Sequence, residues 1–296
     1  MSYEPKLPRK LSSVRKLILS DHVNDKITEA KKNRDDEFNT QYQRYCLEVS
    51  NRMECINSCK SEIAFSWRNA DIAAVFYGIY RYIWEHIKLG PIQPTRRAAS
   101  EEEEKWNSGS EGERRVADYL SARLSDDWTI VLGYSNAKGE IDQLLVGPRG
   151  IFAIEIKNVN GVVHCDEDQW WRDKYDNYGK LLETNLPMAD KGGRGPSRQL
   201  NEPTNLLQSH INKKLSIGRI QRAVILSHNK SMLGTLTSIT VDVVATIHNF
   251  DYERMLARQS KIFEAITVDE ILNEIRQHHV DFKSSPHRMS SASAHR

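Results

Sequence analysis

The sequence predicts an α/β domain with a mixed sheet, preceded by an N-terminal region that is entirely α-helical. Residues 20–88 contain no proline and a single glycine, and their apolar residues recur at steps of three and four, which is the helical period. Beyond about residue 100, short apolar segments of strand length alternate with helical segments. A chain of 296 residues is long enough for two domains.

Changes in composition predict the boundaries of these parts. The first residues are basic and contain two prolines. Gly90, Pro91 and Pro94 end the helical pattern before an acidic run. The last residues are rich in Ser, His and Arg, a composition that cannot build a core. We therefore expect a basic arm (1–20), a helical domain (21–99), a linker (100–108), an α/β domain (109–283) and a disordered tail (284–296).

We expect the N-terminal helices to form a hairpin or a coiled-coil-like pair with at least one break. The charged stretch 31–37 has no apolar face, and the apolar spacing loses its phase after Val49. Seven aromatic residues between Phe65 and Trp84 should be buried against a partner, because exposed aromatic surface is costly. This pattern favours a homo-oligomer or a protein partner bound through these helices.

In the C-terminal part we expect helices at 111–124, 197–215 and 268–278. Pro203 is tolerated only in a first helical turn, so the middle helix should begin near Leu200 and leave Gln199 at its edge. The polar, glycine-rich stretch 173–195 is expected to be a loop. The expected strands are 129–132, 141–146, 151–157, 162–165, 222–226 and 239–244.

Charge and composition exclude several classes of protein. The chain has 42 Lys+Arg and 40 Asp+Glu, a net charge of +2, but residues 1–100 carry +5 and the remainder carries −3. No apolar run is long enough to span a membrane, and the first residues lack the apolar stretch of a signal peptide, so we expect a cytoplasmic protein. The four cysteines have neither zinc-site nor paired spacing and should be reduced.

The most informative segment contains Asp142, then twelve residues, then Glu155 and Lys157. Side chains alternate along a strand, so Glu155 and Lys157 should share one face. The tight turn at 147–150 folds the strand of Asp142 back, antiparallel to the strand of Glu155, so the two carboxylates can approach each other. A solvated ion pair on a strand surface is the alternative interpretation of Glu155 and Lys157.

These residues suit the hydrolysis of phosphodiester bonds. Asp142, Glu155 and the main-chain carbonyl of Ile156 provide hard oxygen donors, which Mg²⁺ and Mn²⁺ prefer. Lys157 could orient the attacking water and offset the charge that develops on a phosphate. The expected cofactor is therefore Mg²⁺ or Mn²⁺.

The segment resembles the nuclease-related domain (NERD) family of the PD-(D/E)XK nuclease superfamily. The resemblance covers about residues 109–244 and does not reach the first hundred residues. It implies a restriction-endonuclease-like mixed sheet flanked by helices. The residues that carry it are Gly109-Ser110-Glu111-Gly112-Glu113, Gly139-Glu140-Ile141-Asp142, Gly150 to Asn158, Gly161-Val162-Val163, Trp170-Trp171 and Pro196 to Leu200.

Carried over by residue, the resemblance implies that Asp142 and Glu155 ligate metal and that Lys157 is the catalytic lysine. It further implies that Glu113 is an auxiliary acidic residue and that Gln199 lines the site. Each of the latter two has a structural alternative, because a carboxylate in a first helical turn complements the helix dipole and a glutamine near a helix start can cap it.

Several residues are candidates for contact with nucleic acid. The glycine-rich loop that contains Lys191, Arg194 and Arg198 is the preferred phosphate contact, and Lys213 and Lys214 form a second basic cluster. Trp170 and Trp171 could stack on bases, but adjacent residues of a strand face opposite sides, so one of them should be in the core.

The resemblance and the site residues together favour a Mg²⁺- or Mn²⁺-dependent deoxyribonuclease, with RNA not excluded as a substrate. The −3 charge of the C-terminal part favours the main alternative, a non-catalytic module that keeps the nuclease fold and binds nucleic acid or a protein. A helical scaffold with a subordinate nuclease-like part is a third hypothesis. Strand preference, cleavage mode and sequence specificity are not encoded in any single residue that we can identify.

Overall fold

A computed structural model of the chain describes residues 14–176, 178–257 and 262–280. The first thirteen residues of the expected basic arm and the expected tail 284–296 lie outside the described residues. The chain divides into two compact units. The helical unit is formed by residues 26–104, and the sheet unit by the described parts of residues 1–25 and 105–296. The helical unit is thus an insertion in the sequence of the sheet unit.

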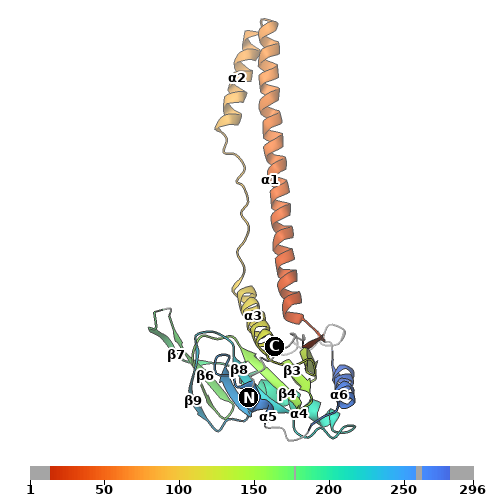
Figure 1. Ribbon diagram of the computed structural model, residues 1–296. Helices are drawn as coiled ribbons and strands as arrows, with labels where there is room; N and C mark the ends of the chain where they lie inside the picture. The colour runs from red at the N-terminus through yellow and green to blue at the C-terminus, as the bar shows by residue number, and fades with distance from the viewer. Residues whose placement is uncertain (1–13, 177, 258–261, 281–296) are drawn as a thin grey trace, which may run out of the picture. The chain divides into compact units, whose positions relative to one another are not determined.

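The described residues form helices and strands in the order shown in Figure 1. The helices are α1 (His22–Arg68), α2 (Ile72–Ile87), α3 (Glu101–Ser121), α4 (Pro196–Ile211), α5 (Tyr252–Ala257) and α6 (Ala265–His278). The strands are β1 (Arg15–Ile18), β2 (Thr129–Asn136), β3 (Gly139–Gly147), β4 (Gly150–Lys157), β5 (Gly161–Asp166), β6 (Gln169–Tyr175), β7 (Leu181–Pro187), β8 (Gln221–Leu226), β9 (Ser231–Thr237) and β10 (Val243–Thr246). None of the described helices is long and apolar enough to cross a bilayer.

Helix α1 is unbroken over 47 residues, so the expected break at 31–37 or after Val49 is wrong. The chain instead turns at Ala70, whose φ is 52°, and the carboxylate of Asp71 accepts a hydrogen bond from the main-chain N–H of Ala74 at 3.1 Å to cap α2. The apolar pattern of α1 shifts because the segment that packs on it changes along its length, and not because the helix stops.

Helix α2 packs antiparallel against the end of α1. Gly78 permits this contact, since a Cβ there would lie 2.7 Å from Cγ1 of Ile63. The guanidinium of Arg52 donates to the carbonyl of Glu85 at 2.7 Å. Residues 88–100 then return along α1 without regular structure, and Arg34 forms an ion pair with Glu103 at 3.1 Å. The folded helical unit therefore brings its two ends together.

The main sheet of the sheet unit has six strands in the order β1-β2-β3-β4-β8-β10. Strands β2, β3 and β4 pair antiparallel, and the remaining neighbours pair parallel, so the predicted mixed α/β class is confirmed. Strand β1 lies within the expected basic arm and pairs with β2 at the edge of the sheet, which corrects the expectation that residues 15–18 are loose.

Helices cover both faces of the main sheet. Leu200 and Leu207 of α4 and Ile271 of α6 join one buried cluster, and Val116 and Leu120 of α3 join the cluster on the other face. Seven of the eight residues of β4 are buried, as expected for a strand covered on both sides. Each face of the sheet therefore has its own apolar core, and β4 contributes side chains to both.

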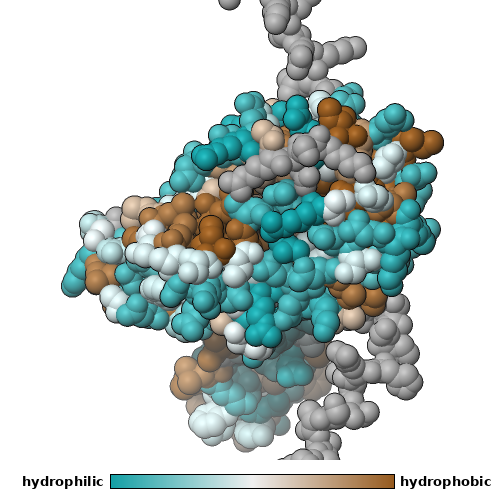
Figure 2. All heavy atoms as spheres, turned by 90° about the horizontal axis from the view of Figure 1, so that it is seen from below, coloured by the Kyte–Doolittle hydropathy of each residue, from teal (hydrophilic) through white to brown (hydrophobic). Residues whose placement is uncertain are grey.

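A second sheet has the order β7-β6-β5-β9. Strand β7 lies in the stretch that we expected to be a loop, and β9 was also not predicted. Six of the seven residues of β7 are exposed, so its sequence lacks the alternation that indicates a half-buried strand. Figure 2 shows a largely hydrophilic face with apolar side chains gathered on the side where Figure 1 places β6, β7 and β9. The exposed large apolar residues of these strands include Leu181, Leu182 and Met232.

Helix α4 begins at Pro196, one residue before the expected range 197–215 and four before Leu200, where Pro203 indicated the start. Pro196 needs no hydrogen-bond acceptor at the first helical position, and Gly195 precedes it in an extended conformation. Pro203 lies inside the helix and is buried, and its carbonyl accepts a hydrogen bond from Nδ2 of Asn136 at 2.9 Å. The helix thus continues through Pro203, although this residue has no N–H to donate to the main-chain oxygen of Gln199, and Gln199 lies in the first turn of α4.

Candidate active site

The position of Asp142 depends on the pairing of β2 with β3. The pairs Leu132↔Gln143 and Tyr134↔Ile141 place Gly133 opposite Asp142. Gly133 has a φ of +68°, and a Cβ there would lie 1.9 Å from the main-chain oxygen of Ser20. No other residue type fits this position. The chain that leads from β1 into α1 thus crosses close over the strand beside Asp142.

Asp142 and Glu155 come from neighbouring strands, as the sequence predicts. Oδ2 of Asp142 accepts a hydrogen bond from the main-chain N–H of Ile156 at 2.6 Å, which ties the carboxylate to β4. Glu155 is only 3% exposed, so its pair with Lys157 is not a solvated surface contact. A buried carboxylate without a charged partner would be strongly destabilising, and this one is paired.

Lys157 connects two elements of the site. Its ammonium donates to Oε1 of Glu155 at 2.6 Å and to Oε1 of Gln199 at 2.9 Å. Nε2 of Gln199 in turn donates to the main-chain oxygen of Arg194 at 2.6 Å, which fixes the orientation of the amide. Gln199 therefore contacts the expected lysine and does not act as a cap at the edge of its helix.

Glu113 reaches the site because Gly112 lets α3 approach the end of β4. A Cβ on Gly112 would lie 2.6 Å from Oγ of Ser227 and 2.7 Å from Cβ of Asn158. Nδ2 of Asn158 donates to the main-chain oxygen of Ser108 at 2.7 Å and holds the helix at this position. The glycine of the Gly-Glu pair thus serves close packing, and the glutamate that follows it turns toward the other carboxylates.

The carboxylates are close enough to affect each other's protonation. Burial, followed by the charges of Glu140 and Glu155, raises the pKa of Glu113 to about 7. Burial, and next the charge of Glu155, raises the pKa of Asp142 well above its usual value. Burial opposes the charged form of Lys157, but the charges of Glu155 and Asp142 outweigh it and raise the pKa of this lysine. The site therefore concentrates negative charge around one ammonium group.

The donor set fits a hard divalent cation. Within the described ranges, no group of three or more His, Cys, Asp or Glu side chains is arranged to hold a metal ion. The candidate ligands are the two carboxylates of Asp142 and Glu155 together with the carbonyl of Ile156. Their oxygen chemistry and their mutual repulsion both favour Mg²⁺ or Mn²⁺.

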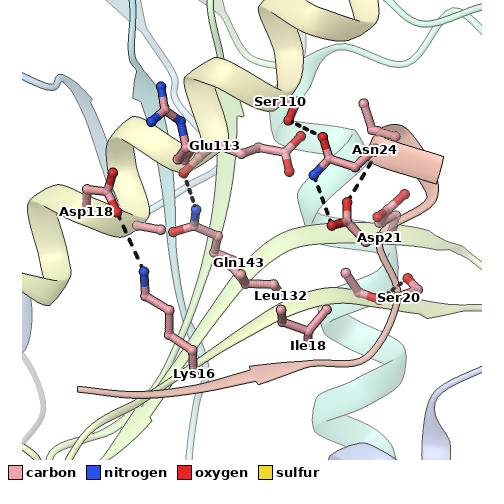
Figure 3. A pocket seen from close by; sticks show the side chains of 15 residues that line it. Lys16, Ile18, Ser20, Asp21, Asn24, Ser110, Glu113, Asp118, Leu132 and Gln143 are labelled. Carbon is pink, nitrogen blue, oxygen red and sulfur yellow. Dashed lines mark hydrogen bonds and ion pairs between the residues drawn. The ribbon is translucent and has the colours of Figure 1, made fainter. Parts of the chain in front are cut away.

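A cavity of about 340 Å³ adjoins the site on the side of α3 and β1 (Figure 3). Glu113, Glu140 and Asp21 supply carboxylates to its lining. Gln143 also lines the cavity and is fully buried, and its Nε2 donates to the main-chain oxygen of Glu113 at 2.7 Å. Sequence reasoning did not single out Gln143, although it directly follows Asp142 in the motif and could have been considered for that reason.

Three of the five cations proposed to contact phosphate are engaged in ion pairs. Arg194 pairs with Asp190 at 2.8 Å, Arg198 pairs with Glu202 at 2.7 Å, and Lys214 pairs with a carboxylate of α6 at 2.8 Å. Lys191 and Lys213 are exposed. The contact of Arg194 with Asp190 closes the loop before α4 and so helps to place the carbonyl that orients Gln199.

The two tryptophans have different environments. Trp170 is 4% exposed, and its Nε1 donates to Oγ of Ser197 at 2.9 Å. Trp171 is half-buried and stacks on His164, with ring centroids 5.6 Å apart. One tryptophan is therefore a core residue, as strand alternation predicts.

The mixed sheet, the two carboxylates on neighbouring strands and the lysine two residues after Glu155 form the arrangement that the resemblance to nucleases implies. Residues 108–227 match the model of the NERD family, described as the nuclease-related domain. This match confirms the family that the motifs indicate and extends from α3 to the residue after β8. No curated protein and no solved structure matches the chain.

Proposed function

We propose that the chain is a Mg²⁺- or Mn²⁺-dependent nuclease that hydrolyses phosphodiester bonds of DNA. The observation that carries the proposal is the contact of Lys157 with both Glu155 and Gln199, beside Asp142. Residues 42 positions apart in the sequence meet there in the arrangement that the family pattern implies. An ion pair between Lys157 and Glu155 that served stability alone would not need the additional hydrogen bond to the amide of Gln199.

Asp142, Glu155 and the carbonyl of Ile156 would hold the divalent cation. The bound cation would neutralise charge on the phosphate and lower the pKa of water. The raised pKa of Lys157 keeps its ammonium charged, so this residue stabilises the negative charge that develops on the phosphate rather than acting as a base. Gln199 holds Nζ of Lys157 in place through Oε1. Glu113, with a pKa of about 7, is poised to accept a proton.

The test is cleavage by the purified full-length chain of labelled double-stranded DNA, single-stranded DNA and RNA, each with Mg²⁺, Mn²⁺ or a chelator. We expect metal-dependent cleavage of DNA, and we expect Asp142→Asn and Lys157→Ala each to lower the rate by at least about 100-fold. The matched control is Asp126→Asn, which removes an exposed carboxylate in the turn after α3. Cleavage that survives Asp142→Asn in a folded protein would contradict the proposal, and cleavage of RNA alone would correct the substrate.

The ion pairs of Arg194, Arg198 and Lys214 favour a second candidate, a module with the nuclease fold that binds a partner without cleaving it. A duplex binder needs free cations for phosphate, and three of those expected here are already paired. Thermal unfolding with Mn²⁺ separates the two candidates, because a bound cation must raise the melting temperature. A chain that neither cleaves nucleic acid nor is stabilised by Mn²⁺ or Mg²⁺ supports the second.

A further inference from the structure

Helix α2 places its apolar residues on the outside of the helical hairpin. Both of its charged residues are engaged in ion pairs: Arg81 pairs with Glu62 of α1 at 2.9 Å, and Glu85 pairs with Lys88 at 2.7 Å. The positions buried against α1 are the small Val75 and Gly78. A solvated amphipathic helix directs polar side chains toward water, whereas the large apolar side chains of α2 point away from α1.

The outer face of α2 is continuous. Eight large apolar residues, each between 39% and 71% exposed, occupy an arc of about 160° at 3.6 residues per turn. They are Ile72, Phe76, Tyr77, Ile79, Tyr80, Ile83, Trp84 and Ile87. We call this set the outer face. It contains no Asp, Glu, Lys or Arg, and Ile72, Phe76, Ile79 and Ile83 follow one another at steps of four, three and four residues, the spacing of a helix–helix seam.

The size of the outer face matches what a stable dimer buries. An aromatic side chain can bury ~150–250 Å² and an isoleucine somewhat less, so the eight residues expose on the order of 800 Å² at their observed exposures. A standard protein interface buries roughly 800 Å² on each partner. Soluble monomers rarely expose an apolar patch of this extent.

The chemistry of the outer face indicates which partner covers it. Helix α2 has 16 residues, fewer than the roughly 20 that span a bilayer. A helix that lies on a membrane surface is rich in Lys and Arg on its polar face, whereas the only Lys or Arg within α2 is Arg81, which is already paired. An uncharged seam is self-complementary, because a two-fold axis would bring no like charges together.

We propose that the outer face of α2 is a dimer interface, at which a second copy of the chain packs its own α2 to form a four-helix bundle with the two copies of α1 on the outside. Two helices alone cannot bury both faces of α2, and a bundle of four can. This inference does not depend on the nuclease activity proposed above.

The experiment is analytical ultracentrifugation of the full-length chain over a range of concentrations. We expect a dimer at micromolar concentration, and we expect the double variant Ile79→Glu/Ile83→Glu to raise the dimer dissociation constant by at least about 100-fold. The matched control, Leu47→Glu/Met53→Glu, places the same charges at two comparably exposed apolar positions of α1 and should leave the dimer intact. Circular dichroism checks that each variant keeps its helix content.

A second measurement holds even if the double variant does not fold. Ile83→Cys should form a disulfide between copies under mild oxidation, well above the level seen for the wild type with its native exposed Cys46 and for Met53→Cys. Cosedimentation with vesicles of phosphatidylcholine and phosphatidylglycerol should show no binding. A monomeric wild type, a dimer insensitive to the double variant, or a monomer that binds vesicles through the outer face would each overturn the proposal.

Discussion

The two units treat their large apolar side chains in opposite ways. In the sheet unit, Leu144 and Phe152 are fully buried. In the helical unit, Phe76 and Trp84 of α2 remain 68% and 52% exposed. The sheet unit buries its large apolar side chains, whereas the helical unit exposes those of α2.

This contrast separates what each unit needs in order to be stable. Burial of apolar surface is the dominant favourable term in folding, and the sheet unit obtains it from its own chain on both faces of its main sheet. The outer face of α2 contributes nothing of this kind until another surface covers it. Contacts within the sheet unit therefore explain its stability. Contacts within the helical unit leave the outer face of α2 exposed to water.

The same substitution in the two units gives the largest expected effect. Ile154→Ala removes a fully buried side chain and should lower the free energy of unfolding by about 2–5 kcal/mol. Ile83→Ala removes a side chain that is 49% exposed and should cost less than about 1 kcal/mol at high dilution. Chemical denaturation followed by circular dichroism measures both.

The comparison becomes sharper when the protein concentration is raised. If the outer face is an interface, the cost of Ile83→Ala should increase with concentration while that of Ile154→Ala should not. Equal costs for the two variants at all concentrations would remove the contrast between the units.

A pair of glycines in α3 gives the next effect. Gly112→Ala introduces a Cβ only 2.6 Å from Oγ of Ser227 and should lower the free energy of unfolding by about 1–3 kcal/mol. Gly109→Ala lies on the same helix with no atom within 4 Å and should raise it by about 0.4–1 kcal/mol. Helix propensity alone predicts that both alanines raise the melting temperature. Close packing at the site predicts that Gly112→Ala lowers it, and thermal denaturation of both variants distinguishes the two explanations.

Gln199 tests whether the amide positions Lys157. Gln199→Leu keeps the side-chain volume but removes the acceptor at 2.9 Å, so we expect kcat to fall roughly tenfold with KM nearly unchanged. Asn201→Leu on the same helix removes a hydrogen bond to Thr240 and should leave both constants unaltered. A rise in KM alone would assign Gln199 to substrate binding instead.

The smallest effect concerns the pH dependence of the α4–α6 contact. Nδ1 of His278 lies 2.6 Å from the hydroxyl of Tyr134, and its ring stacks on His210. Burial, followed by the charges of His210 and Lys213, lowers the pKa of His278 below its usual 6.5. As the pH falls the unfolded chain therefore takes up the proton first, so stability present above about pH 6.5 is lost as the pH falls toward the folded pKa.

We expect the melting temperature of His278→Gln to rise relative to that of the wild type as the pH falls from 8 to 5, because the variant lacks this destabilisation. Glu113, whose pKa of about 7 lies in the same range, acts equally on both proteins. His248→Gln, which changes an exposed histidine of the sheet unit, should leave the slope of the wild type in place. Two neighbouring groups titrate outside this pH range. Hydrogen bonds from Lys214 and His210 lower the pKa of Glu274, so it titrates at more acidic pH. Burial raises the pKa of Tyr134 to about 12, so it titrates at more alkaline pH. A slope unchanged by His278→Gln would contradict this prediction.

Much of the site could be predicted because it depends on rules that act over short distances. Strand alternation places Glu155 and Lys157 on one face, and a four-residue turn folds the strand of Asp142 back on them. The pairing of Arg194 with Asp190 could not be predicted, since spacing alone does not distinguish a cation that binds phosphate from one that closes its own loop.

The parts of the fold that could not be predicted depend on tertiary contacts. Strand β7 is exposed, so no apolar alternation identifies it. Helix α1 continues through residues 31–37 because Arg34 finds an acidic partner 69 positions further along the chain, which no local pattern records. Pro203 points to a later helix start by a local rule, but the buried face of α4, which includes Leu200, Pro203 and Leu207, packs as one helix from Pro196 onward.

The insertion of the helical unit also sets an order of events during synthesis. Strand β1 leaves the ribosome before β2, because its partner Thr129 follows Arg15 by 114 residues, and at about 5–20 residues per second this takes roughly 6–23 s. Meanwhile the helical unit can fold and, through the ion pair of Arg34 with Glu103, bring the ends of the long intervening loop together. Strand β1 must thus wait for its partner while the whole helical unit is made, and closure of that loop reduces the entropy that its pairing must overcome.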